Sequence, residues 1–233
     1  LIAEMVDLRA ERAKLLGFKT FADYRLDDQM AKTPPAARKL LDEVWRRARA
    51  KAGAERDALQ DMIAQEGGNF ALAPWDWRYY AEKLRKAKFD LDEAEIKPYL
   101  QLERMIEAAF ETARRLFGLT FTPVTVPLYH PDARAWEVRD QSGGHVGLFV
   151  GDYFARGSKH SGAWMTSLRD QEKLSGSVRP IILNACNFSK PAAGAPALLS
   201  FEEARTLFHE FGHALHGLLS NVTYPLLAGT AVP

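Results

Sequence analysis

The first half of the chain has apolar residues at the three- and four-residue steps that are typical of amphipathic helices. The clearest run lies between Tyr99 and Gly118, and its apolar positions are Leu102, Met105, Ile106, Ala109, Phe110, Ala113, Leu116 and Phe117. Gly118 is a natural helix stop. Weaker runs of the same kind predict helices over residues 2–17, 36–64 and 75–86.

After Gly118 the pattern changes to short β-branched or aromatic runs that proline and glycine interrupt. These runs are TFTPVTVPLYH, RAWEVRD, HVGLFVGDYFA and RPIILNACNF, and they are typical of strands in a small sheet. Residues 140–144, DQSGG, predict a hairpin turn. The polar segment RGSKHSGAWMTSLRDQ is either a surface loop or a sheet edge that meets a ligand. We therefore predict a mainly helical α+β protein, with a helical region over residues 1–118 and a small sheet plus one helix over residues 119–233.

That last helix is predicted to begin at Phe201, directly after a capping box. In this motif the Ser200 hydroxyl accepts a hydrogen bond from a first-turn amide, and the Glu203 carboxylate accepts one from the Ser200 amide. The helix carries apolar side chains on more than one face, at Leu207, Phe208, Phe211, Leu215, Leu218 and Leu219. We therefore expect it to be largely buried.

Three residues of this helix, His209, Glu210 and His213, form the pattern His-Glu-x-x-His. The histidines are four residues apart and lie on one helical face, where both imidazoles can bind one ion, while Glu210 projects beside them. The pattern is typical of metallopeptidases that hold one Zn²⁺ per chain and use the glutamate as general base. Buried histidines that only satisfy backbone groups are the alternative, but the complete pattern on an independently predicted helix favours zinc.

His216 follows on the same helical face but does not match a third zinc ligand. A metzincin has glycine at this position and its third histidine three residues later, where this chain has Leu219. We interpret His216 as a residue that supports the ligands or packs beside them. A catalytic zinc usually has three protein ligands, and residues 211–233 contain no Asp or Glu, so the third ligand is expected upstream or outside this chain.

Composition and charge restrict the class of partner and the cellular location. The 31 Lys and Arg residues balance 30 Asp and Glu residues, so no overall field attracts nucleic acid or an anionic membrane. Cys186 is the single cysteine, and no segment has the roughly 18 consecutive apolar residues of a membrane span. We therefore expect a cytoplasmic monomer with Cys186 as a buried structural thiol. Since Leu1 replaces an initiating Met and no signal peptide follows, we also expect a piece of a longer chain.

Several stretches resemble the thimet oligopeptidase family of zinc peptidases (family M3), especially its bacterial peptidyl-dipeptidase branch. The likeness covers essentially the whole chain and is carried by TLFHEFGHALHGLLS, YPLLAGTAVP, NACNFSKP, PALLSFEEA, LRAERAKLLGFKTFADYRL, MAKTP, WDWRYYAEKLRKAKFDLDE and DYFARGSKHSGAWM. The resemblance implies a zincin-like metallopeptidase fold in which helical subdomains flank a deep channel. This chain would form an incomplete part of that channel.

The resemblance also implies the roles of the motif residues. His209 and His213 would bind Zn²⁺, and Glu210 would be the catalytic carboxylate, in agreement with the motif itself. The third ligand would be a glutamate roughly 25 residues past His213, about five residues beyond Pro233.

The substrates that the resemblance implies are short peptides, from which C-terminal dipeptides are released. Gly162, Ala163 and Trp164 would lie beside the channel and offer backbone groups to an extended peptide, unless they form an ordinary sheet edge. An endopeptidase of the oligopeptidase A type would share the same catalytic residues and is the alternative activity. A further alternative is that residues 1–233 by themselves are a non-catalytic fragment, because the third ligand is absent from them.

Overall fold

The computed structural model of the chain describes residues 1–90, 92–174 and 176–231. These residues form two compact units, Leu1–Leu91 and Asp92–Val232. Helices and one five-stranded sheet make up the units, which confirms the predicted α+β class. In the described ranges, none of the helices combines the length and the apolarity needed to cross a membrane.

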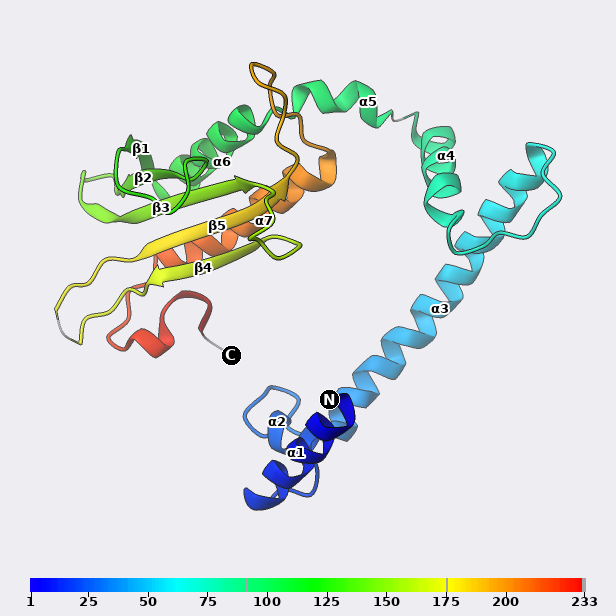
Figure 1. Ribbon diagram of the computed structural model, residues 1–233, viewed down its shortest axis with the longest axis horizontal. Helices are drawn as coiled ribbons and strands as arrows, with labels where there is room; N and C mark the ends of the chain where they lie inside the picture. The colour runs from blue at the N-terminus through cyan, green and yellow to red at the C-terminus, as the bar shows by residue number, and fades with distance from the viewer. Residues whose placement is uncertain (91, 175, 232–233) are drawn as a thin grey trace. The chain divides into compact units, whose positions relative to one another are not determined.

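The first unit is built from helices, which are α1 (Ile2–Leu15), α2 (Phe21–Leu26), α3 (Pro34–Gln65) and α4 (Trp77–Phe89) (Figure 1). Helix α3 starts with a proline pair, at positions where the missing amide hydrogen costs no helical hydrogen bond. Leu59 and Ile63 of α3 pack with Tyr80 of α4 in a small apolar core. The three helices predicted for this region are confirmed, whereas the short α2 was not predicted.

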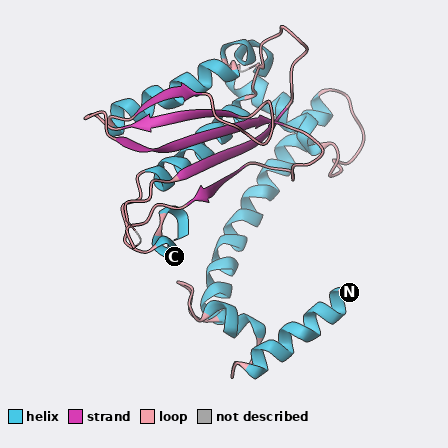
Figure 2. Ribbon diagram, turned by 60° about the vertical axis from the view of Figure 1, so that its left-hand side comes forward, coloured by secondary structure: helices cyan, strands magenta, loops and turns pink. Residues whose placement is uncertain are grey.

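The second unit contains the sheet and the helix that carries the His-Glu-x-x-His pattern. Its helical elements are α5 (Glu93–Ile96), η1 (Lys97–Tyr99), α6 (Leu102–Phe117), α7 (Phe201–Leu218), η2 (Pro225–Leu227) and η3 (Gly229–Ala231). Its strands are β1 (Thr120–Val124), β2 (Arg134–Arg139), β3 (His145–Phe154), β4 (Trp164–Arg169) and β5 (Ile181–Phe188). The strand order is β1-β2-β3-β5-β4, in which β3 and β5 are parallel and the other neighbours antiparallel (Figure 2).

The turn predicted at residues 140–144 is confirmed, and it joins the antiparallel strands β2 and β3. The Asp140 carboxylate organises it by accepting hydrogen bonds from the backbone N–H groups of Ser142 and Gly144, at 2.9 and 2.8 Å. Such side-chain bonds to nearby amides are the usual way in which aspartate stabilises a turn.

Strand β4 is an edge strand that occupies the second half of the polar segment, whereas residues 155–163 before it form a loop; a ligand at this edge stays a prediction. The strand pairs with β5 from Trp164, opposite Ala185, to Arg169, opposite Ile181. Its first four residues are half-buried and its last two exposed. The strand therefore lacks the alternation of apolar and polar residues by which a strand is usually found in a sequence.

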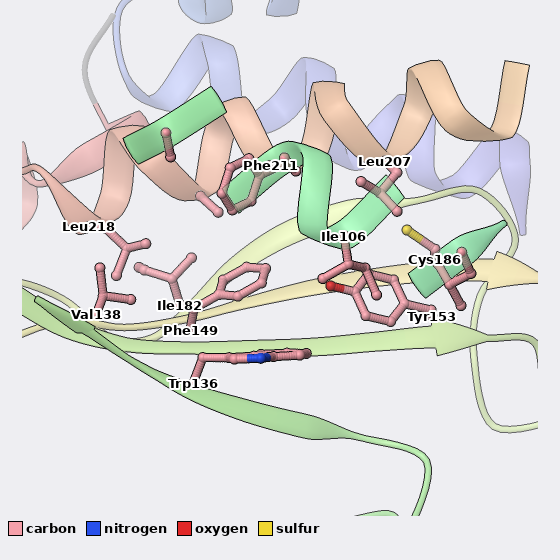
Figure 3. Close-up of a cluster of buried hydrophobic side chains, with 14 of the residues drawn as sticks. Ile106, Trp136, Val138, Phe149, Tyr153, Ile182, Cys186, Leu207, Phe211 and Leu218 are labelled. Carbon is pink, nitrogen blue, oxygen red and sulfur yellow. The ribbon is translucent and has the colours of Figure 1, made fainter. Parts of the chain in front are cut away.

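Helices α6 and α7 pack on one face of the sheet, and their apolar residues form one core with it. Figure 3 shows Leu207, Phe211 and Leu218 of α7 pointing towards strand residues such as Phe149 and Ile182. Because α6 belongs to this core, the second compact unit begins at Asp92, although helix changes to strand only after residue 117. The core fixes which face of α7 is turned to the sheet.

Candidate functional site

Helix α7 begins at the predicted capping box. The Glu203 amide donates to the Ser200 hydroxyl at 3.1 Å, and the Ser200 amide donates to the Glu203 carboxylate at 2.7 Å. Both bonds satisfy amides that the first helical turn leaves without a partner. The capping box thus fixes the residue at which the helix starts, and with it the positions of the His-Glu-x-x-His residues along the helix.

Only one face of α7 is buried, so the expectation of a largely buried helix was wrong. The buried residues are Ala204, Leu207, Glu210, Phe211, Ala214, Gly217 and Leu218. His209, His213 and His216 lie on the exposed face, and the apolar Phe208 and Leu219 are 36% and 41% exposed. The helix packs on the sheet through a single face, and the histidines are turned away from that contact.

The imidazoles of His209 and His213 converge at the centre of the exposed face. Their Nε2 atoms lie 3.1 Å apart, and their rings are nearly perpendicular, with centroids 4.7 Å apart. Two nitrogen ligands of one tetrahedral zinc ion, each at its usual bond length, lie about 3.3 Å apart. In the described ranges, no group of three or more His, Cys, Asp or Glu side chains gathers where it could hold a metal ion. The structure therefore brings together the two predicted histidines as a partial donor set.

Glu210 differs from the two histidines in being buried, with 7% of its surface exposed. Helical geometry places it about 60° around the axis from His213, on the side that faces the sheet. The pKa of the Cys186 thiol, in β5, is raised to about 12. Burial is the main cause, and the negative charge of the Glu210 carboxylate contributes to the rise. The prediction that Cys186 is buried is confirmed.

His216 lines an open cavity of about 610 Å³. Other residues of its wall are Phe117, Gly212, Leu219, Val222 and Leu227. The supporting role expected for His216 stays a prediction.

Gly162, Ala163 and Trp164 stand at the entrance to edge strand β4. Gly162 is exposed and has φ +92°, a left-handed conformation that favours glycine. Ala163 packs against the main core, and Trp164 is the first paired residue of β4. Since α7 packs against β4, this edge strand and the helix that carries the histidines are neighbours within the second unit.

A buried charge cluster holds the segment that leads to this edge, and the sequence reasoning missed it. The carboxylate of Asp152, 1% exposed, accepts two hydrogen bonds from Arg156 at 2.8 and 2.6 Å, one from Tyr129 at 2.8 Å and one from Lys159 at 3.0 Å. Burial alone would raise the pKa of Asp152, but these hydrogen bonds lower it to about 2. Charged residues in a polar segment usually indicate an exposed surface, so no pattern of residues predicted this buried cluster.

Comparison with known proteins places the chain in a family. Residues 1–233 match the family described as "Peptidase family M3". The chain is 47% identical over 235 residues to the dipeptidyl carboxypeptidase of Escherichia coli (strain K12), a match that covers 100% of this chain and 34% of that protein. It is 45% identical over 235 residues to the dipeptidyl carboxypeptidase of Salmonella typhimurium, again with 100% and 34% covered.

A second kind of relative is the oligopeptidase A of Escherichia coli. The identity is 36% over 222 residues, covering 94% of this chain and 33% of that protein. The chain thus spans about a third of the length of the curated relatives it matches. Because the family match extends over all 233 residues, as the resemblance in the sequence predicted, the chain belongs to peptidase family M3.

Proposed function

We propose that the protein containing this chain is a zinc peptidase that hydrolyses short peptides and releases C-terminal dipeptides. His209 and His213 are two of its zinc ligands, and Glu210 is its general base. The observation that carries the proposal is the 3.1 Å separation of the two Nε2 atoms on a helix whose rotation the core fixes. The names of the first two relatives, both dipeptidyl carboxypeptidases, support the reaction type.

The two imidazole nitrogens suit zinc in their chemical type as well as in the distance between them. Neutral imidazole nitrogens are among its preferred ligands, and catalytic zinc sites keep one position open beside three protein ligands. In the described ranges no third donor gathers with the two histidines, and the family resemblance implies that a glutamate supplies it. Residues 1–233 alone are therefore expected to bind zinc weakly and to lack peptidase activity.

The chemistry divides between the metal and the buried carboxylate. Zinc, when bound, supplies Lewis acidity that makes a water molecule more acidic and polarises the peptide carbonyl. Glu210 accepts the proton of the attacking water and then delivers it to the amine nitrogen of the departing product. Burial of the Glu210 side chain, which is 7% exposed, limits its movement and so keeps the carboxylate positioned for this proton transfer.

The substrate in this proposal lies along the free edge of β4. The segment Gly162, Ala163 and Trp164 offers an extended peptide those of its backbone groups that do not face β5, and the peptide joins the sheet as an additional strand. The packing of α7 on β4 brings a peptide on that edge next to the helix that carries Glu210. Recognition of backbone alone would explain how one site accepts peptides of different sequence. The cytoplasmic location and the monomeric state stay predictions.

Mass spectrometry of a cleaved peptide tests the reaction type. The full-length protein is incubated with a short unstructured peptide that has a free C-terminus. Loss of successive C-terminal dipeptides is the expected result. Internal cuts would instead support an endopeptidase, the alternative that the similarity to oligopeptidase A favours.

Substitution of the general base tests the mechanism. Glu210→Gln in the full-length protein keeps the shape of the side chain but removes its basicity, so kcat should fall about 10³-fold while the bound zinc remains. Glu202→Gln is a matched control, because Glu202 lies on the exposed first turn of the same helix and pairs with Arg205. Full activity in Glu210→Gln would overturn the assignment.

A further inference from the structure

The β3–β4 loop, defined here as residues 155–163, connects a core strand to the edge where the proposed substrate lies. Its course is fixed near its start by the ammonium group of Lys159, whose side chain is 4% exposed. The Lys159 Nζ atom donates to the backbone carbonyls of Asp152, Phe154 and Cys186, at 3.0, 2.8 and 2.5 Å, as well as to the Asp152 carboxylate. The first half of the loop is therefore anchored to the backbone of β3 and β5.

The second half of the loop is held by Asn187 of β5. The Asn187 Nδ2 atom donates to the backbone carbonyl of His160 at 2.6 Å and to that of Gly162 at 2.7 Å. Both acceptors are carbonyl oxygens, so the contact requires two N–H donors from one side chain. A primary amide supplies both, whereas an ionised carboxylate of the same size supplies none.

The register of the sheet explains why this contact lies where it does. Trp164 is opposite Ala185, so continuing the antiparallel pairing places Gly162 opposite Asn187. Gly162 has φ +92°, and the regular ladder begins only at Trp164. The Asn187 side chain thus replaces the ladder hydrogen bond at the point where the backbone departs from strand geometry.

This contact determines which backbone groups reach the free edge. The Gly162 carbonyl and the Ala163 N–H belong to one planar trans peptide unit, in which they point in opposite directions. A Gly162 carbonyl held towards β5 therefore turns the Ala163 N–H outward, where an added peptide strand would find it. Without the Asn187 amide, this peptide unit is free to rotate.

We propose that Asn187 is a positioning residue that sets the backbone of Gly162 and Ala163, and thereby the register in which a peptide binds to the edge of β4. The proposal rests on the proposed function, in which the peptide binds at this edge. Asn187 touches neither the two histidines nor Glu210 in this role; it acts through the loop. Its removal should weaken the binding of substrate rather than the chemical step.

The test compares Asn187→Asp with Asn187→Ser in the full-length protein, using a short peptide with a free C-terminus. Asn187→Asp should raise KM about tenfold, the effect of losing roughly one to two net hydrogen bonds, with kcat changed less than about twofold. Asn187→Ser, which lacks the negative charge that Asn187→Asp places against the two carbonyl oxygens, should give a smaller rise. Asn69→Asp is the matched control, because Asn69 is an exposed asparagine of the first unit and should leave both constants unchanged. Zinc content should be the same in all four proteins, and the midpoint of thermal unfolding should fall by no more than about 2–4 °C in the Asn187 variants.

Two results would overturn the proposal. One is an unchanged KM in both Asn187 variants. The other is a fall in the unfolding midpoint or zinc content in both variants that accounts for the loss of activity, which would make Asn187 a structural support. A wild-type protein that does not hydrolyse the peptide, or hydrolysis that Glu210→Gln leaves intact, would instead overturn the proposed function and this proposal with it. Wild-type hydrolysis together with an unchanged KM in both Asn187 variants would overturn this proposal alone.

Discussion

Gly217 of α7 lies so close to Ile182 of β5 that a Cβ atom added to the glycine would be 2.7 Å from Ile182 Cδ1 and 3.1 Å from its Cγ1. Ile182 is 1% exposed and has little room to move. A glycine within a helix costs stability, so its presence here indicates that close contact with the sheet requires it. The last turns of α7 are thereby held against β5, the neighbour of edge strand β4.

We predict that Gly217→Ala lowers the free energy of unfolding by about 1–3 kcal/mol, because the added methyl group overpacks the interface between α7 and β5. Gly53→Ala in α3 is the control, since a Cβ there meets nothing within 4 Å. That substitution should stabilise its helix by about 0.5–1 kcal/mol. Urea unfolding of both variants measures the difference, and equal effects would contradict the packing argument.

The two exposed histidines His213 and His216 should differ in their effect on zinc. His213→Gln removes a proposed ligand and should weaken zinc affinity more than about 100-fold, whereas His216→Gln should weaken it less than about tenfold. Competition with a chromophoric chelator measures both affinities in the full-length protein. Equal losses in the two variants would make His216 a ligand and contradict its expected supporting role.

Stability should depend on pH through Asp152. Its pKa is lowered to about 2, below the ordinary 3.8, so the ionised form stabilises the fold fully above pH 4. That contribution, about 2 kcal/mol, should be lost as the pH falls from 4 towards 2. Chemical unfolding across this range is the measurement. Asp152→Asn should be less stable at neutral pH and should lose less on acidification; a parallel decline in both proteins would contradict the assignment.

Lys159 should matter far more for stability than an exposed lysine with a similar ion pair. Lys159→Met leaves the buried Asp152 carboxylate and three carbonyls with fewer donors, so we expect a loss of about 3 kcal/mol in the free energy of unfolding. Lys190 pairs with Asp132 at 2.7 Å, but its side chain is 59% exposed. Lys190→Met should therefore cost less than about 1 kcal/mol. Urea unfolding at neutral pH compares them, and similar losses would be inconsistent with the burial of Lys159.

Much of the fold could be predicted from the sequence wherever one element carries its own pattern. The helix α6, the capping box at Ser200 and the turn at Asp140 each depend on residues within a few positions of one another, and all three are confirmed. The same holds for the His-Glu-x-x-His pattern, in which helical spacing alone brings His209 and His213 together.

The features that the sequence did not predict depend on contacts between distant residues. Strand β4 is half-exposed and lacks alternation, so its identity depends on pairing with β5. The exposed face of α7 could not be predicted from its apolar residues, because only the position of the sheet decides which of them are covered. The contact of Asn187 with Gly162 spans 25 residues and joins two segments with no pattern in common.

The two outer strands of the sheet differ in how well they resist pairing with another chain. Strand β1 carries Pro123, which has no amide hydrogen to donate, and a proline at an edge hinders the addition of a further strand. Strand β4 has the sequence WMTSLR, with every amide intact and no proline. An edge that can accept a peptide can equally accept the same edge of a second molecule. We therefore expect a bound peptide and a second protein molecule to compete for the edge of β4. Added short peptides should then reduce self-association in concentrated solutions of the protein.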